Sequence, residues 1–186
     1  MNAQTLKNHL GFAADNKNSL LAFLGKTLLF SLLIAISAQI TIPAWPVPMT
    51  LQPTAVMVIG LLTTPSIAVA SVIAYIIEGA CGLPVFHAFK SGIPHLFNTT
   101  GGYIFGFLPL VFLISSLKDK SQSFTYRFGI CLLGSIALFT CGIGYLSLFV
   151  GFGKAIQLGL LPFLPKTVVS IAFAILSANL IHKIKI

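Results

Sequence analysis

One apolar run, residues 49–81, constrains the fold more than any other part of the chain. Its 33 residues carry a single charged side chain, Glu78. One helix of that length would measure about 50 Å, whereas the hydrocarbon core of a bilayer is about 30 Å thick. The sequence TTPS at 63–66 divides the run and is typical of a turn. The run therefore predicts two short neighbouring helices.

Four further apolar runs are long enough, or nearly so, to cross a bilayer. They are residues 20–42, 101–117, 127–152 and 163–181. Charged residues make up 8% of the chain and hydrophobic residues 56%, whereas a soluble domain needs about a quarter of its residues charged. We predict an all-α integral membrane protein with six transmembrane helices. Residues 1–19 would form a polar cytoplasmic segment and residues 20–186 the membrane domain.

Basic residues are distributed unevenly over six such crossings. Eight of the eleven fall on the side that carries both termini: Lys7, Lys17, Lys26, Lys118, Lys120, Arg127, Lys183 and Lys185. Lys90, Lys154 and Lys166 remain for the other side. This asymmetry predicts a multi-pass protein of the cell (inner) membrane with both termini cytoplasmic. A nucleic-acid surface would need a clustered basic face, which the sequence lacks.

The connections predicted on the outer side are long, apolar and rich in Pro and Gly. They read TIPAWPVPMT, CGLPVFHAFKSGIPHLFNTTGG and GFGKAIQLGLLPFLPK, whereas the inner ones read TTPS and KDKSQSFTYR. Irregular backbone at membrane depth is tolerated only where protein buries it or where it lines a watery cavity. We therefore expect short helices with membrane-dipping outer loops that enclose a binding site.

Charged side chains near this outer side are candidates for substrate binding. Glu78 could contact a ligand, couple protons, or be an interface acid bonded to loop backbone, because an acid at mid-bilayer is costly. Lys166 opens the last helix, whose N-terminus also favours an anion. Lys90 is a further candidate, and Lys154 is the third outward cation. Snorkelling to the interface is the alternative for all three lysines.

Polar and aromatic residues of the outer connections complete the candidate site. The sequence NTTGGY at 98–103 places Asn98, Thr100 and Tyr103 before a helix, where they could bind a ligand or cap the helix. Trp45 and Tyr75 could wall an apolar pocket or anchor the chain at the membrane interface.

Catalytic, metal and cofactor sites are not predicted. Cys81, Cys131 and Cys141 have no metal-ligand spacing, and the four histidines form no ligand pair. The chain has no phosphate-binding loop of Walker type, no G-x-S-x-G motif and only three acids. We therefore expect neither an enzyme nor an ATPase.

The chain resembles the BioY family, the S components that capture biotin for energy-coupling-factor (ECF) vitamin transporters. The resemblance runs from about residue 30 to residue 181. It rests on four pieces in this order: PVPMTLQ (46–52), GLPVF (82–86), TGGYIFGF (100–107) and LGLLPFLP (158–165). The first piece ends at Gln52, which joins the candidate substrate-binding residues.

Membership in such a family implies biotin binding between the outer loops of a six-helix protein. It also implies partners: a transmembrane coupling subunit and two cytoplasmic ATP-binding subunits, which would drive vitamin uptake. Ser31 and Ala35, spaced i and i+4 on the first helix, would allow close helix approach. They are the candidate contacts with the coupling subunit.

Two motifs depart from the family pattern. BioY-like chains usually follow the last-loop PF-P with glycine and aspartate, then a lysine three residues on, where this chain has Lys166, Thr167 and Ser170. The usual GPTGGY reads NTTGGY here. We expect Lys166 to supply the cation for a carboxylate, and Glu78 or Asn98 the acceptor for a ureido group.

Other classes of membrane protein remain open at this point. A proton-coupled secondary transporter of a small carboxylated solute would use Glu78, although such carriers often contain repeats and none is visible. A membrane enzyme and a purely structural subunit are the remaining alternatives.

Overall fold

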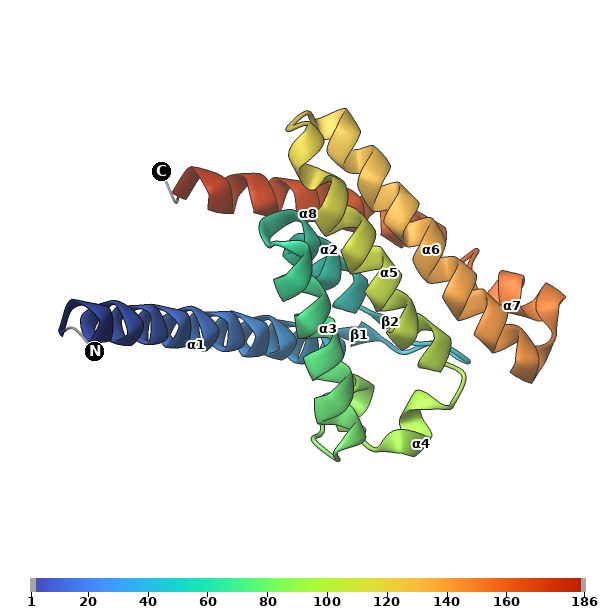
Figure 1. Ribbon diagram of the computed structural model, residues 1–186. Helices are drawn as coiled ribbons and strands as arrows, with labels where there is room; N and C mark the ends of the chain where they lie inside the picture. Colours follow the sequence, from blue (N-terminus) through green and yellow to red (C-terminus); the bar gives the residue numbers. More distant parts are fainter. Residues whose placement is uncertain (1–2, 185–186) are drawn as a thin grey trace.

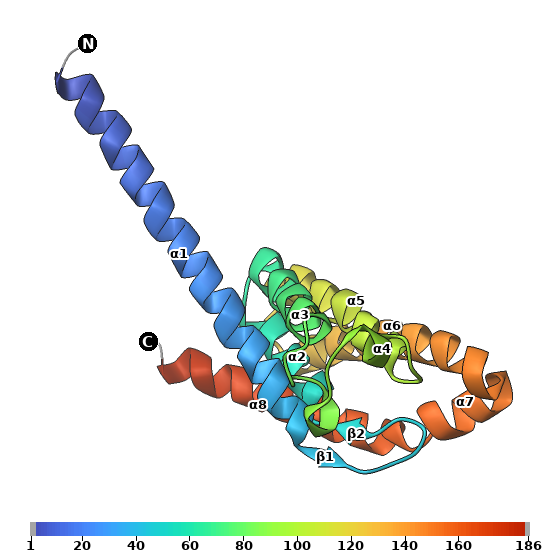
Figure 2. The same ribbon diagram turned by 90° about the horizontal axis from the view of Figure 1, so that it is seen from below.

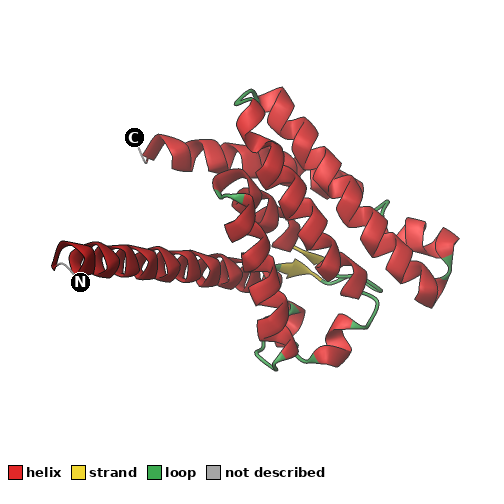
Figure 3. Ribbon diagram, viewed as in Figure 1, coloured by secondary structure: helices red, strands yellow, loops and turns green. Residues whose placement is uncertain are grey.

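The computed structural model describes the backbone of residues 3–184 and the side chains of residues 19–181 and 183. The chain is almost entirely helical, with one small β-hairpin (Figures 1 and 3). In chain order the elements are α1 (Ala3–Gln39), β1 (Thr41–Ile42), β2 (Met49–Thr50), α2 (Gln52–Leu62), α3 (Pro65–Ala80), η1 (His87–Phe89), α4 (Ile93–Leu96), α5 (Gly101–Leu117), η2 (Lys118–Lys120), α6 (Phe124–Val150), α7 (Phe152–Gly159) and α8 (Phe163–Ile184).

The predicted turn at TTPS is confirmed. Helix α2 ends at Leu62, Thr63 and Thr64 are non-helical, and Pro65 opens α3. Proline suits the first turn of a helix because its missing N–H would have no intrahelical partner there. A second proline, Pro53, lies in the first turn of α2 for the same reason.

Helix α2 is shorter than predicted because the residues before it form a strand. Thr41 pairs with Thr50 and Ile42 with Met49 in an antiparallel hairpin, so α1 ends at Gln39 and α2 begins at Gln52. The 11 residues of α2 span about 16 Å, roughly half the hydrocarbon core. Most of α2 is buried, chiefly against α5 and α8.

Four helical segments are long and apolar enough to cross a membrane. They are Ser19–Gln39, Gly101–Lys120, Phe124–Val150 and Phe163–Ile181, with Gln52–Leu62 and Pro65–Ala80 as shorter apolar helices. The protein is therefore a helical, multi-pass membrane protein. Figure 2 shows α1 projecting away from the other helices over its N-terminal half.

Helices α5 and α6 pack closely because glycines line their contact. A Cβ atom added at Gly102 would lie 2.7 Å from the Cys141 carbonyl oxygen, and one at Gly106 would lie 3.0 Å from that of Leu138. Small residues allow this kind of close approach between membrane helices. Tight packing here fixes Tyr103 and Phe107, which belong to the same turns of α5.

The loop elements gather at one end of the molecule. In Figure 1 the hairpin, α4 and α7 lie toward the right and lower right, whereas the N-terminus and the C-terminus lie toward the left and the α5–α6 connection lies at the top. The long connections therefore cover the end of the bundle opposite both termini.

Candidate functional site

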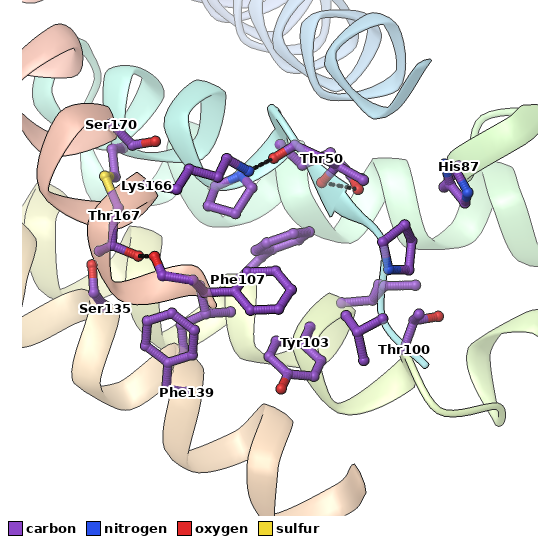
Figure 4. Close-up of a pocket in the computed structure, with 18 of the residues that line it drawn as sticks. Thr50, His87, Thr100, Tyr103, Phe107, Ser135, Phe139, Lys166, Thr167 and Ser170 are labelled. Carbon is purple, nitrogen blue, oxygen red and sulfur yellow. Dashed lines mark hydrogen bonds between the residues drawn. The ribbon is translucent and has the colours of Figure 1, made fainter. Parts of the chain in front are cut away.

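A cavity lies between the helix bundle and these connections (Figure 4). Its empty volume is about 750 Å³, the open mouth included. It is lined by Val47, Pro48, Thr50, Gln52, Pro53, Met57, Tyr75, Phe86, His87, His95, Thr100, Tyr103, Ile104, Phe107, Ser135, Leu138, Phe139, Phe163, Lys166, Thr167 and Ser170. The lining is mostly apolar and aromatic, with a small number of polar groups, as in most small-molecule sites.

Polar groups at one side of the cavity form a chain of hydrogen bonds. Lys166 Nζ, from the first turn of α8, donates to the carbonyl oxygen of Thr50 in the hairpin. Thr50 Oγ1 donates to Gln52 Oε1 over 3.0 Å, and Gln52 Nε2 donates to the Tyr75 hydroxyl over 2.6 Å. Because the Tyr75 oxygen accepts this bond, its own hydrogen remains free to be donated.

Two groups of aromatic rings wall the cavity. Phe86 packs edge-on against Tyr75, with ring centroids 5.5 Å apart, and stacks on His95 at 5.1 Å. The second group is made by Tyr103, Phe139 and Phe163, with centroids 6.2 to 6.5 Å apart. Edge-to-face and stacked pairs in this range are favourable beyond their burial. The rings can therefore hold a flat apolar molecule between them.

Polar side chains lie at opposite ends of the cavity. Figure 4 shows Lys166, Thr167, Ser170 and Ser135 toward one end, and Thr100 and His87 toward the other, with Phe107 between them. The site therefore matches a molecule that is apolar in its middle and polar at both ends, with an anionic group at the Lys166 end.

Asn98 lies behind this cavity and positions two of the residues that line it. Its Oδ1 accepts from the Thr100 backbone N–H over 2.9 Å and from Thr100 Oγ1 over 2.8 Å. Its Nδ2 lies 3.3 Å from His95 Nδ1. Burial, followed by the nearby charge of Lys90, lowers the pKa of both His87 and His95. Both rings are therefore neutral at pH 7.

Four hydrogen bonds tie the covering connections to the bundle or to each other. Gln39, at the end of α1, donates to the Phe86 carbonyl and accepts from the Phe89 N–H, each over 3.0 Å. Thr99 Oγ1 donates to the Pro46 carbonyl over 3.0 Å, and the Tyr103 hydroxyl donates to the Gly159 carbonyl over 2.9 Å. The cavity is thus closed by segments that single side chains hold in place.

The structure brings five of the nine predicted substrate-binding residues into the cavity lining: Gln52, Tyr75, Thr100, Tyr103 and Lys166.

The other four lie outside it. Trp45 is 80% exposed near the tip of the hairpin, Lys90 is exposed near the two histidines, and Asn98 lies behind Thr100. Glu78 lies on the face of α3 that meets α1, where its Oε2 accepts a hydrogen bond from Ser31 Oγ. This placement indicates a structural role, with a side chain of α1 as the partner in place of the loop backbone that we expected.

Ser31 and Ala35, the predicted partner contacts, are both buried within the chain itself. Ser31 faces Glu78 of α3, so the small residues allow α1 and α3 to approach each other. The side of α1 left free in this chain carries large apolar side chains instead, among them Leu28, Leu29 and Leu32.

Several lining residues carry no signal in the sequence. Ser135, Phe107 and Phe139 lie within long apolar runs, where nothing separates a cavity-facing residue from a lipid-facing one. His95 was considered only as a metal ligand. Thr167 and Ser170 stood out as departures from the family pattern, and both line the cavity. Among the residues that the structure describes, no three His, Cys, Asp or Glu side chains cluster as a metal site.

Known proteins resemble this chain along most of its length. The family model that matches residues 13–185 is described as the BioY family. A probable biotin transporter BioY of Pyrococcus horikoshii is 38% identical over 151 residues, which cover 81% of this chain and 90% of the relative. The biotin transporter BioY of Thermotoga maritima is 34% identical over 159 residues, covering 85% and 94%.

A solved structure has the same fold. The crystal structure of the S-component for biotin from an ECF-type ABC transporter superposes with a TM-score of 0.80 at 26% sequence identity, covering 89% of this chain and 93% of that one. Family model, relatives and fold agree with the four sequence pieces from which the resemblance was first drawn. The chain belongs to the BioY family.

Proposed function

We propose that this protein is the biotin-binding S component of an ECF-type transporter. It captures biotin at the outer face of the membrane and carries no energy source of its own. The observation that carries the proposal is the cavity of a BioY-family chain, with aromatic walls and Lys166 at one end. Biotin has an apolar bicycle and chain, one carboxylate and one ureido group, which correspond to these parts.

The carboxylate of biotin would pair with Lys166. In the structure the Lys166 ammonium donates to the Thr50 carbonyl, a neutral acceptor that an ionised carboxylate outcompetes. Thr167 and Ser170, one and four residues further along α8, line the same end. The Thr167 hydroxyl donates to the Phe163 carbonyl over 2.8 Å, so Ser170 would donate to the second carboxylate oxygen. This arrangement replaces the family aspartate and lysine with a lysine one turn earlier.

The bicycle would lie between the two aromatic groups, with its ureido group toward the other end of the cavity. The free hydrogen of the Tyr75 hydroxyl is suited to the ureido oxygen. The Thr100 hydroxyl gives its hydrogen to Asn98, so its oxygen is suited to accept from a ureido N–H. Neutral His87 offers a nitrogen acceptor for a ureido N–H, whereas His95 Nδ1 already faces the Asn98 amide donor. Gln52 and Asn98 would act by orienting Tyr75 and Thr100.

The membrane topology that goes with this function has six crossings, α1, α2, α3, α5, α6 and α8, with both termini in the cytoplasm. The hairpin, the segment between α3 and α5, and α7 would then dip into the outer leaflet. Delivery inward would require a transmembrane coupling subunit and two cytoplasmic ATP-binding subunits. The exposed leucine face of α1 is available for the coupling subunit.

Titration of the purified protein with biotin and biotin methyl ester tests the proposal. We expect stoichiometric biotin binding and at least about tenfold weaker binding of the ester, because a charge-assisted hydrogen bond contributes about 1.5–3 kcal/mol. Absence of biotin binding would overturn the proposal. Uptake into vesicles that is driven by a proton gradient without ATP would favour a secondary transporter instead.

A further inference from the structure

A second cavity lies at the end of the bundle that carries both termini. It is lined by Gln122, Arg127, Leu176, Asn179, Leu180 and Lys183. These residues come from the start of α6, the loop before it and the end of α8. The cavity is separate from the biotin site, since the two share no lining residue.

Arg127 is a buried cation at this cavity without a carboxylate partner. Its residue surface is 2% exposed, and its guanidinium donates to Asn179 Oδ1 and Gln122 Oε1. Its Nε is buried and has no hydrogen-bond partner. Among the described side chains the one ion pair is Lys118–Asp119. A buried charge with only neutral partners is costly, so a site built around it favours an anion.

Several hydrogen-bond donors remain available in the cavity. Arg127 takes the side-chain oxygens of Asn179 and Gln122, so both amides keep their NH₂ groups for another molecule. Lys183 adds an exposed ammonium. Arg127 also lies in the first turns of α6, where the helix dipole favours negative charge.

The other part of the cavity is apolar and continues along α8. Leu176 and Leu180 line the cavity and are 62% and 60% exposed, and Val169 and Phe173 continue the same face of the helix with 68% and 58% exposed. From residue 180 to residue 169 this stripe rises about 16 Å, close to half of a ~30 Å hydrocarbon core. An acyl chain of one leaflet has this reach.

We propose that this cavity binds the phosphate of an anionic phospholipid, with one acyl chain along the apolar stripe of α8. Basic pockets between membrane helices are suited to such headgroups. The apolar stripe distinguishes a lipid from free phosphate, which would use only the polar half. It also distinguishes a lipid from an acidic segment of a partner protein, because a peptide carboxylate would not contact an apolar stripe that runs into the bilayer core.

Binding of phosphatidylglycerol and phosphatidylcholine to the purified protein tests this proposal. Both lipids carry a phosphate, but only the first has a net negative charge. Native mass spectrometry of detergent-solubilised protein titrated with each lipid gives the two affinities. We compare the wild type with Asn179→Asp, which sets a carboxylate beside Arg127, and with Lys183→Gln. Lys120→Gln is the matched control, because Lys120 is an exposed cation at the same end that does not line the cavity.

We expect phosphatidylglycerol to bind more tightly than phosphatidylcholine. Lys183→Gln and Asn179→Asp should each weaken it by about fivefold or more, the usual weight of one basic side chain at an anionic lipid surface. Lys120→Gln should leave it unchanged. Biotin binding, which uses the other end of the molecule, shows that each variant is folded.

Three results would overturn the proposal. Equal affinities for the two lipids would show that the charge is not recognised. An equal effect of Lys120→Gln and Lys183→Gln would point to diffuse surface attraction. Complete displacement of phosphatidylglycerol by millimolar inorganic phosphate would identify a site for the free anion.

Discussion

At the scale of single residues, Lys166 carries the largest expected effect on ligand binding. Lys166→Ala should weaken biotin binding by about tenfold or more, because the carboxylate loses its charged partner in a half-dry site. Isothermal titration of the purified variants measures the change. Lys154→Ala is the matched control, since Lys154 is an exposed cation at the same end that does not line the cavity. Equal losses in the two variants would contradict the pairing of Lys166 with the carboxylate.

Glu78→Gln separates a structural role of this acid from a role in binding or proton coupling. We expect biotin affinity to change by no more than about twofold, because Glu78 lies outside the cavity. The melting temperature should fall, since the hydrogen bond from Ser31 loses its charged acceptor, a loss of about 1 kcal/mol. Ser31→Ala should reproduce that fall. A large loss of biotin affinity in Glu78→Gln but not in Ser31→Ala would instead indicate that Glu78 takes part in biotin binding.

Rare residue types marked part of the site, although Glu78, Lys90 and Trp45 lie outside the cavity. An uncompensated lysine at a helix start, or a tyrosine within an apolar helix, is unusual enough to be noticed, and Lys166 and Tyr75 both line the cavity. Ser135 is one of several serines on membrane helices that bond back to their own helix. Its place at the cavity depends on the rotation of α6, which packing against α5 decides.

At the scale of elements, Gln39 links α1 to the loop that covers the cavity. Ala88 and Phe89 both have φ of +56°, a left-handed conformation that costs a non-glycine residue about 1–2 kcal/mol. The two hydrogen bonds of Gln39 help to hold this strained turn. Gln39→Leu should therefore speed biotin dissociation by about threefold or more and accelerate hydrogen exchange at the Phe89 amide.

Gln157→Leu is the control for this experiment, because Gln157 is exposed on α7 and belongs to another covering segment. Unchanged dissociation and exchange in Gln39→Leu would show that the turn is held by the chain around it. An equal effect of Gln157→Leu would show a general loosening of the covering segments.

The α5–α6 contact predicts a sharp difference between two glycines. Gly102→Ala places a methyl group 2.7 Å from the Cys141 carbonyl oxygen, a backbone atom that cannot move away, and overpacking of this kind costs about 1–3 kcal/mol. Gly144 of α6 has nothing within 4 Å of the added Cβ. The melting temperature should fall in Gly102→Ala and stay within experimental error in Gly144→Ala. A fall of equal size in both would contradict close packing at Gly102.

Among the elements, signals within a few residues of sequence predicted the short-range features of the fold. The turn at Thr63 and Thr64 follows from a proline and from a run too long for one helix. The hairpin of Thr41–Ile42 with Met49–Thr50 was not predicted, because its pairing joins the ends of two apolar runs across a proline-rich loop. Such a pairing depends on the helices that hold the two strands together.

At the scale of the whole molecule, single cysteines can test the six-crossing topology. In a background with Cys81, Cys131 and Cys141 replaced by alanine, Thr64→Cys and Ser121→Cys should react only from the cytoplasmic side with a membrane-impermeant thiol reagent. Gly153→Cys should react only from outside. All three positions lie in connections or at a helix start. Reaction of Thr64→Cys from outside would mean that α2 and α3 do not form a crossing pair.

More of the overall architecture than of the site could be predicted from the sequence. The architecture depends on properties of long segments, whereas the site depends on the positions of single side chains. Apolar length predicted a helical membrane protein, and the order of four sequence pieces predicted the family. The number of true crossings depends on α2, whose 11 residues rely on neighbouring helices to cover their ends. No property of the 49–81 run alone decides that.

The contact between Lys166 and the Thr50 carbonyl has a consequence for the rates at which different ligands associate and dissociate. This contact connects the last helix to the hairpin, and a carboxylate can replace it by offering the ammonium a charged partner. A neutral molecule of the same shape has no charged group to replace the hydrogen bond between Lys166 and Thr50. Such neutral analogues should therefore associate more slowly than biotin as well as dissociate faster.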